Sequence, residues 1–224
     1  MPDYLLSHPT SGASSVPVIT VPTLWSVLIN GLSPVWPTTR TTIDNCPLGD
    51  AWPCSSLPQH GLPWERIVPF HKLTQWLCYS LMGPMQRVMN VHFAGRELLT
   101  GLPEYRNGGL LVDTGLLTLK KEEGERGLRN FRERAAIGEG GKVEVVPLFK
   151  TEDDVIVEWR AVTVGFLDEL LVDVNASLGL SGLERLTLAQ MLEAGSWKVS
   201  LPNLYSRPSC RRECDDFGVC VWLT

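Results

Sequence analysis

Several short stretches of this chain gather acids, arginines, amides and aromatic side chains that could bind or transform a polar ligand. His71 and Gln75 are one helical turn apart, on the face opposite an apolar stripe. The imidazole could act there as an acid or base near neutral pH while the amide orients a ligand. The alternative is a surface histidine that only hydrogen-bonds a neighbour.

A second stretch has the sequence PEYRNGG, in which Glu104, Tyr105, Arg106 and Asn107 precede two glycines. Residues 107–109 predict a turn, and glycines let the backbone approach a ligand closely. An acid, a fork-shaped cation and an amide in one turn offer donors and acceptors to a polar substrate. The alternative is a turn with an internal Glu–Arg pair.

Asp113 follows the apolar residues 110–112, which suggest a short buried strand, and a further strand is expected at 116–119. A carboxylate at the end of a buried strand is costly unless it is paired or functional. The alternative is an Asx turn or a cap.

Asp154 and Glu158 are four residues apart at the start of an expected helix. Two like charges on one face mildly destabilise a helix, so they call for a cation, such as Arg106 or Arg40, or a shared proton. The alternative is an acidic helix start that complements the dipole, which fits Asp154 better than Glu158.

A long loop-like region over residues 33–63 is rich in proline and has few periodic apolar positions. Long loops inside a domain are uncommon and are often functional. The residues that stand out in it are Trp36, Arg40, Asp50 and Trp52.

Periodicity predicts an α+β fold that is predominantly α-helical with a few short strands. Gly83-Pro84 is expected to end one helix, and the pair Thr151 and Asp154 is expected to cap the longest one. The expected helices cover residues 22–30, 70–81, 85–90, from 151 onward, and 188–193, and a strand is expected at 143–149. The apolar faces of the two main helices are expected at Leu73, Trp76, Leu77 and Leu81 and at Trp159, Val162, Phe166, Leu170 and Val174.

The composition is that of a globular protein of 224 residues, with 44% hydrophobic residues and a net charge of −5. No basic stripe exists that could follow a nucleic-acid backbone, so no nucleic-acid partner is expected, although local arginines could hold a small anion. No secretory signal and no apolar run long enough to cross a membrane is present, so no membrane partner is expected.

The six cysteines form no C-x-x-C pair, and together with the missing signal they indicate a cytoplasmic protein with mostly free thiols. The spacing of Cys210, Cys214 and Cys220 matches no standard zinc pattern, so neither a metal nor a cofactor is expected. Common catalytic motifs such as GxSxG, the P-loop and HExxH do not occur.

Five strings resemble the uracil catabolism protein 4 family, a domain-of-unknown-function family of fungi and bacteria. PEYRNGG and VEWRA are the most specific parts of this resemblance, which covers residues from about 34 to 198 in order. The strings are PLGDAW (47–52), VPFHKLTQWLCYSL (68–81), LTGLPEYRNGGLLVDTGLL (98–117), VIVEWRAVTVGFLDEL (155–170) and TLAQMLEAGSWK (187–198).

The resemblance implies a role in pyrimidine (uracil) degradation, with a nucleoside- or nucleotide-like small molecule as substrate and proteins of the same pathway as partners. It also implies a distant fold similarity to the queuosine-nucleotide glycosylase family. That similarity suggests hydrolysis of an N-glycosidic bond, such as that of a ribosyl-urea.

This reaction passes through an oxocarbenium-like state that needs a carboxylate and an acid. Under the resemblance, the carboxylates are Asp113, Glu104, Glu158 and Asp154, and His71 donates a proton to the leaving group. Three arginines could hold a phosphate: Arg106, Arg160 and Arg40. Three aromatic side chains could stack on a planar group: Trp52, Trp76 and Tyr105. The other expected substrate-binding residues are Asn107, Gln75 and Asp50.

The chain also departs from the family pattern. It corresponds to the C-terminal half of the family domain at residues 22–198, preceded by an irregular segment at 1–21. Residues 122–142 are expected to be a surface insertion, and 199–224 a divergent tail, as in a truncated gene product.

Two alternatives to an N-glycosidic hydrolase therefore remain. The protein could be a non-catalytic binding subunit of a uracil-degradation complex, or it could be an inactive truncated fragment.

Overall fold

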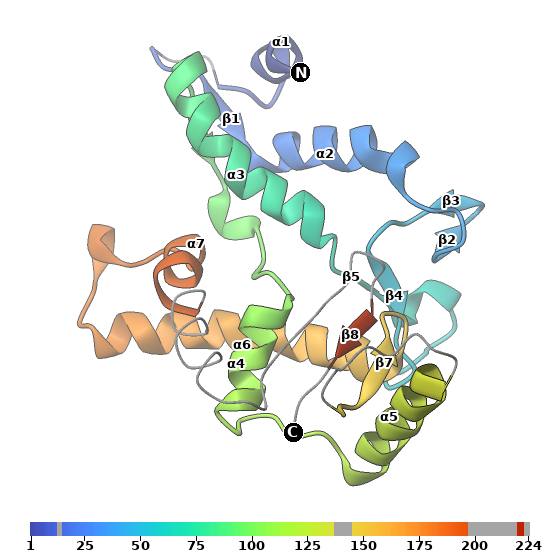
Figure 1. The fold of residues 1–224 in the computed structure, drawn as a ribbon. Coiled ribbons are helices and arrows are strands. Elements are labelled where there is room, and N and C mark those ends of the chain that lie inside the picture. The colour runs from blue at the N-terminus through green and yellow to red at the C-terminus, as the bar shows by residue number, and fades with distance from the viewer. Residues whose placement is uncertain (13–14, 137–144, 197–218, 222–224) are drawn as a thin grey trace. The chain divides into compact units, whose positions relative to one another are not determined.

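The structure, a computed structural model, describes residues 1–12, 15–136 and 145–196, together with the backbone of one strand at 219–221. It is mostly helical with a few short strands, as the sequence predicts (Figure 1). The α-helices are α1 (Pro2–Ser7), α2 (Val21–Leu32), α3 (Lys72–Met89), α4 (Tyr105–Asp113), α5 (Lys121–Arg134), α6 (Asp154–Ser177) and α7 (Leu188–Met191). The strands are β1 (Val18–Thr20), β2 (Thr42–Ile43), β3 (Cys46–Pro47), β4 (Ala51–Pro53), β5 (Ile67–Pro69), β6 (His92–Ala94), β7 (Leu148–Lys150) and β8 (Val219–Val221).

The chain divides into two compact units, and each draws on segments that are far apart in sequence. The first unit contains Met1–Trp52, Pro69–Leu102 and Asp168–Ala189. The second contains Pro53–Val68, Pro103–Leu167 and Gln190–Thr224. Helix α6 therefore gives its first half to the second unit and its last turns to the first.

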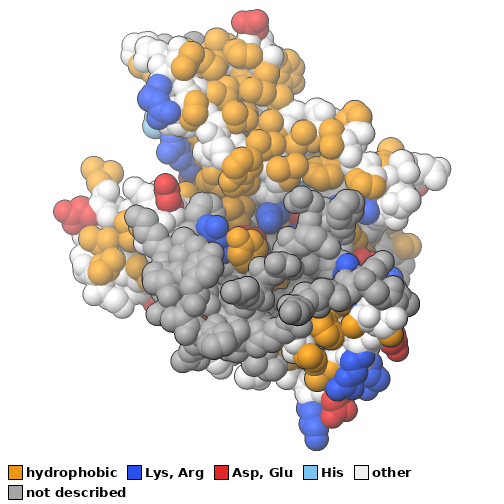
Figure 2. Space-filling model, in the orientation of Figure 1, with side chains coloured by type: hydrophobic (Ala, Val, Ile, Leu, Met, Phe, Trp, Pro, Cys, Tyr) orange, Lys and Arg blue, Asp and Glu red, His pale blue; other side chains and the backbone are white. Residues whose placement is uncertain are grey.

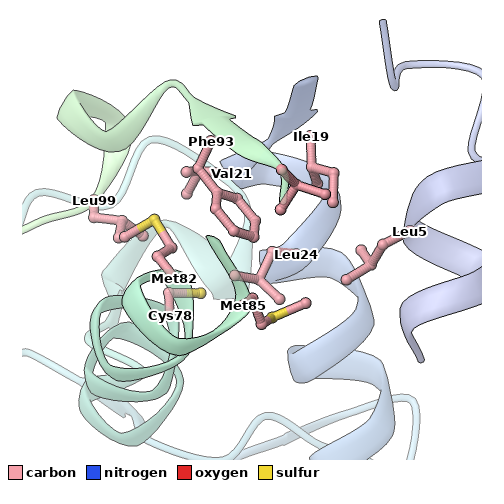
Figure 3. Packing of buried hydrophobic residues seen from close by; sticks show 10 residues of the cluster. Leu5, Ile19, Val21, Leu24, Cys78, Met82, Met85, Phe93 and Leu99 are labelled. Atoms are coloured by element: carbon pink, nitrogen blue, oxygen red, sulfur yellow. The ribbon is translucent and has the colours of Figure 1, made fainter. Parts of the chain in front are cut away.

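The core of the first unit forms where α2 and α3 pack against the parallel pair β1–β6 (Figure 3). Ile19 pairs with Phe93 in this ladder, and both side chains are buried beside Leu24 of α2. Helix α2 begins as expected, because Pro22 occupies the first turn, where a missing N–H costs nothing.

The N-terminal segment corrects one prediction. Residues 1–21 contain a helix, α1, and a strand, β1, instead of being irregular. Leu5 of α1 is fully buried in the core of the first unit, and the Ser11 hydroxyl donates to its carbonyl. Tertiary burial of one leucine thus fixes a helix whose Ser- and Pro-rich surroundings gave no periodic signal.

Helix α3 corrects two further predictions. It runs unbroken through Gly83-Pro84, and Ser80, whose carbonyl loses its partner at Pro84, is exposed. The expected apolar face is also wrong, since Leu73 and Trp76 are 39% and 46% exposed. The buried face is the one that carries Thr74, Gln75, Cys78, Met82 and Met85.

In the second unit, residues 105–113 form helix α4 where the sequence predicted a turn followed by strands. Glu104 caps the helix by accepting a hydrogen bond from the Asn107 backbone N–H at 3.2 Å. Gly108 serves packing, because a Cβ on it would lie 2.4 Å from the Trp159 ring. The expected strand at residues 116–119 is not present either.

The charged segment after residue 120 forms helix α5, in which only Gly127 is buried, so it is a surface segment as expected, although one side packs against the protein. That it is an insertion stays a prediction. Helix α5 lies beside β7 (Figure 1), where the Asn130 amide donates to the Leu148 carbonyl at 2.9 Å. A Cβ on Gly127 would lie 2.6 Å from Pro147, so this glycine permits the close approach. Acidic and basic side chains lie next to one another on the surface of α5 (Figure 2).

The strand expected at 143–149 is displaced to β7, Leu148–Lys150, which pairs antiparallel with β8. Its first two expected positions, 143 and 144, lie outside the described residues, as does the tail at 199–218.

Helix α6 starts where expected but with a different cap. The Asp153 carboxylate accepts from the Val155 N–H at 3.0 Å, whereas the Thr151 hydroxyl donates to Glu152. The fully buried positions are Ile156, Val157, Thr163, Leu167 and Asn175, and the expected stripe lies beside them, with Val162 40% exposed. The last expected helix appears as α7, followed by a π-helical turn over Leu192–Ser196. Within the described residues, no helix has the length and apolar character needed to cross a membrane.

Candidate functional site

A pocket of about 1100 Å³ opens in the second unit, beside the N-terminal half of α6. Its described walls come from the segment after β4, the short helix Pro63–Arg66, the connection between α4 and α5, and both helices α5 and α6. The lining residues with polar or reactive side chains are Cys54, Ser55, Arg66, Thr118, Lys120, Glu123, Arg126, Glu152, Asp153, Asp154, Glu158 and Trp159.

Two of the predicted site residues, Asp154 and Glu158, line this pocket. The Asp154 carboxylate accepts hydrogen bonds from the Ser55 backbone N–H, at 2.9 Å, and from the Ser55 hydroxyl. Glu158 lies one turn further along α6 and is half-buried. The pocket therefore has one carboxylate held by the opposite wall and a second beside it, next to Trp159.

Arg126 organises the acidic rim of the pocket and was not predicted. Its Nη atoms donate to the two Asp153 oxygens at 2.6 and 2.7 Å, and its Nε donates to Glu123 at 2.6 Å. The bond from Arg126 lowers the pKa of Asp153, against desolvation, and the pKa of Arg126 is raised mainly by the same bond. Arg126 thus pairs with Asp153 and Glu123, and the cation expected beside Asp154 and Glu158 is not found among the ion pairs of the described residues.

Arg66 is a second lining residue that was not predicted to be part of a site. Its backbone carbonyl accepts from the Cys54 N–H at 2.8 Å, which joins two segments of the pocket wall. It lies in the loop-like region, where no periodicity or motif marks it. The Cys54 thiol, also in the wall, lies 3.1 Å from the Ser56 hydroxyl.

The strings PEYRNGG and VEWRA meet in the second unit. The Trp159 Nε1–H donates to the Gly108 carbonyl at 3.2 Å, and the Arg160 Nε–H donates to the Pro103 carbonyl at 3.4 Å. Asn107 is 1% exposed, and its Oδ1 accepts from the Ser196 hydroxyl at 2.7 Å. These contacts hold α4 against its neighbours, so these polar groups act in packing.

The remaining α4 candidates lie at its two ends. Arg106 stacks its guanidinium 5.6 Å from the Tyr105 ring centroid and donates from Nε to the Tyr105 hydroxyl at 3.1 Å. Asp113 is exposed in the last turn of α4. The prediction that Asp113 ends a buried strand is therefore wrong, because residues 105–113 form helix α4. None of these three residues lines the described part of the pocket.

The predicted residues of the loop-like region lie in the first unit, where Asp50 joins two family-like strings. Its Oδ2 accepts from the Lys72 N–H at 3.0 Å, and its Oδ1 accepts from the Trp52 indole N–H at 2.8 Å. Its backbone carbonyl accepts from the Phe70 and His71 N–H groups, both at 2.9 Å. Arg40 lies over the Trp52 ring, 5.4 Å from its centroid.

His71 and Gln75 also lie in the first unit, and neither is on an exposed face. His71 adopts a left-handed backbone conformation, with φ at 45°, and packs edge-on against Trp25. Burial lowers the pKa of His71, and the Asp50 charge partly opposes this shift. Gln75 is buried, and its Oε1 accepts from the Thr100 N–H at 3.2 Å, which is a structural role.

The candidates thus form two groups, one in each unit. Within the described residues, no set of three or more His, Cys, Asp or Glu side chains has the geometry to hold a metal ion.

Comparisons with known proteins agree with the resemblance carried by the strings. Uracil catabolism protein 4 of Lachancea kluyveri is 42% identical over 201 residues, which is 88% of this chain and 44% of that protein. Protein urg3 of Schizosaccharomyces pombe is 46% identical over 175 residues, or 78% of this chain and 37% of that protein. The chain therefore spans less than half the length of these relatives.

No solved structure matches the chain, so the similarity to the queuosine-nucleotide glycosylase fold stays a prediction. Residues 1–200 match a family profile described as a protein of unknown function, DUF1688. The match includes the whole first unit and most of the second, and the chain belongs to the DUF1688 family.

Proposed function

We propose that this protein acts in uracil catabolism, where it hydrolyses the N-glycosidic bond of a ribosyl-urea or a related nucleoside-like compound in the pocket of the second unit. The pathway is suggested by the name of the Lachancea kluyveri relative, uracil catabolism protein 4, which is 42% identical to this chain over 201 residues. A cytoplasmic location and partners from the same pathway are part of the proposal.

The observation on which the reaction rests is the composition of the pocket wall. Glu158, Asp154 and the Trp159 ring line one cavity, which is of the size that small-molecule sites have. Carboxylates stabilise the positive charge that develops on a sugar ring, and an indole offers a flat apolar face to a ribose or a ureido group.

In the proposed reaction, water attacks the anomeric carbon as the bond from that carbon to the urea nitrogen breaks. One proton of the water passes to a carboxylate, and the departing nitrogen takes up a proton, so that ribose and urea are the products. Among the four predicted carboxylates, Glu158 fits the role of base best. Asp154 is held by Ser55, Glu104 caps α4, and Asp113 is exposed in the last turn of α4.

The role of His71 as the proton donor stays a prediction and is weakened. Burial lowers the pKa of His71, so a smaller fraction of its imidazole carries a proton to donate near neutral pH than in an unperturbed histidine.

Urea release from ribosyl-urea by the purified 224-residue protein tests the proposal. We expect Glu158→Gln to lower kcat by a factor of about 10² to 10⁴, the usual contribution of a positioned acid or base. Glu169→Gln is the matched control, because Glu169 is exposed on the same helix and does not line the pocket. Equal rates for the Glu158→Gln and unmodified proteins would remove Glu158 from the mechanism.

The same assay separates this proposal from its alternative, a non-catalytic binding subunit. Saturable binding of ribosyl-urea, measured by calorimetry, without any release of urea would support the binding subunit. A folded protein that neither binds nor turns over the compound would contradict both.

A further inference from the structure

Two arginines, Arg66 and Arg126, line the pocket wall, and they differ in their partners. Arg126 satisfies Glu123 and Asp153, whereas Arg66 makes no ion pair with any described residue. The Nε atom of Arg66 is buried and has no hydrogen-bond partner among the residues that the structure describes. Yet its backbone is fixed, because its carbonyl accepts from the Cys54 N–H at 2.8 Å.

A guanidinium N–H can only donate, so the Nε–H of Arg66 requires an acceptor oxygen. A buried donor without an acceptor destabilises the protein, and the loss is larger for a charged group. No described residue supplies this oxygen, and Arg66 lines the pocket. A ligand that brings an acceptor to Arg66 is therefore favoured over one that does not.

The charge of the wall indicates which kind of acceptor fits. Once Arg126 is matched with Asp153 and Glu123, the described lining still contains three carboxylates and two cations. The carboxylates are Glu152, Asp154 and Glu158, and the cations are Arg66 and Lys120. A doubly charged phosphate would meet this excess of like charge in a partly enclosed space, whereas a neutral carbonyl would not.

We infer that Arg66 is a specificity-determining residue that donates to the carbonyl oxygen of a neutral ureido or amide ligand, and that the pocket prefers this ligand to its phosphate ester. The inference rests on the proposed function in one respect, the choice of this pocket as the ligand site. It adds which group of the substrate is recognised and that the substrate is not phosphorylated.

Calorimetric titration with three probes tests the inference: ribosyl-urea, its 5-phosphate and 1-O-methyl riboside, which lacks the carbonyl. We expect ribosyl-urea to bind at least tenfold more tightly than its 5-phosphate. In Arg66→Gln, the affinity for ribosyl-urea should fall about tenfold, the scale of a lost hydrogen bond to a charged group, while the affinity for the methyl riboside stays constant.

Two further variants control for folding and charge. Arg66→Lys keeps the cation and the aliphatic stem but lacks the Nε–H, so it should lose most of the same affinity while its melting temperature stays near that of the unmodified protein. Arg87→Gln changes an exposed arginine of α3 in the first unit and should change neither affinity.

Tighter binding of the 5-phosphate, or an equal loss for both uncharged probes in Arg66→Gln, would overturn the inference. The outcome is distinguishable from failure of the proposed function. Arg66-dependent binding without urea release would leave the inference standing and remove the hydrolase, whereas urea release that is insensitive to Arg66→Gln would do the reverse.

Discussion

Asp50 and Asp153 show how single carboxylates connect distant segments of this chain. Each accepts a backbone N–H at the start of a helix, Asp50 at Lys72 of α3 and Asp153 at Val155 of α6. Each also binds a side chain elsewhere, Trp52 in one case and Arg126 in the other. A carboxylate at this position satisfies orphan donors and faces the positive end of the helix dipole, so it stabilises the helix and fixes the loop that carries it.

At Asp50, the charge should be measurable through His71. Asp50→Asn removes the negative charge that raises the pKa of His71, so we expect this pKa to fall further below its ordinary value. The amide keeps one acceptor oxygen, so its NH2 group faces either the Lys72 or the Trp52 N–H, at a cost of about 1 kcal/mol in unfolding free energy. An NMR titration of the His71 ring protons and a urea unfolding curve check the two effects.

The matched control for this change is Asp44→Asn. Asp44 is exposed in the β2–β3 turn with φ at 49°, a conformation that asparagine also tolerates. It should leave both the His71 titration and the unfolding curve unchanged. A His71 pKa that stays constant or rises in Asp50→Asn would contradict the proposed coupling.

At the level of single residues, the sequence indicated which segments carry polar groups. It did not indicate whether each side chain binds a ligand or another part of the protein. Asn107 and Gln75 looked like ligand-binding amides, yet both are buried and bond other parts of the protein. A side chain that binds a ligand and one that binds a distant segment have the same residue type, and only the fold separates them. Arg66 was missed for the converse reason, because nothing around it in sequence is periodic.

Among the elements, α4 shows where local rules fail. The Gly-Gly pair predicts a turn, but residues 105–113 form a helix because Glu104 caps it and Gly108 admits the Trp159 ring. The spacing of Glu104 to Asn107 was available as a cap signal. The partner of Gly108, 51 residues away along the chain, was not. Helix α3 was predicted, but its buried face was predicted wrongly, because Thr74 and Gln75 are buried and Trp76 is exposed.

The close approach of α4 to α6 predicts the effect of Gly108→Ala. A Cβ there would lie 2.4 Å from the Trp159 ring, so the two helices must separate or the indole must move. Overpacking of this kind costs about 1–3 kcal/mol, which exceeds the gain in helix propensity from alanine. We expect a clear fall in the melting temperature and loss of the Trp159 contribution to near-ultraviolet circular dichroism.

Gly165→Ala, in α6, is the control of opposite sign. No atom lies within 4 Å of the position its Cβ would take, so the substitution should stabilise the protein by up to about 1 kcal/mol through helix propensity. Equal effects of the two substitutions would show that Gly108 is not required for packing.

For the whole molecule, the charge pattern indicates a stability that falls with acid in two steps. The pKa of His71 is lowered by burial, so the unfolded state binds a proton more readily than the folded state as the pH falls below about 6.5. The pKa of Asp153 is lowered chiefly by its bond from Arg126, so its contribution is present above about pH 3.8 and is lost as the pH falls through its folded-state pKa. The His71 shift therefore destabilises the folded protein in acid, whereas the Asp153 shift stabilises it at neutral pH.

Urea unfolding at a series of pH values between 7.5 and 3 should show both steps, because each group has its own variant. His71→Gln should flatten the decline that begins below about pH 6.5 and leave the lower one in place, since a neutral amide does not titrate. Asp153→Asn should flatten the decline below about pH 4 and lower the stability at pH 7, because Arg126 then keeps only Glu123 as a charged partner. Identical pH profiles for the two variants would contradict the assignment of one step to His71 and the other to Asp153. If each variant loses a different step, the imidazole in the first unit and the Arg126–Asp153 pair in the second unit titrate independently.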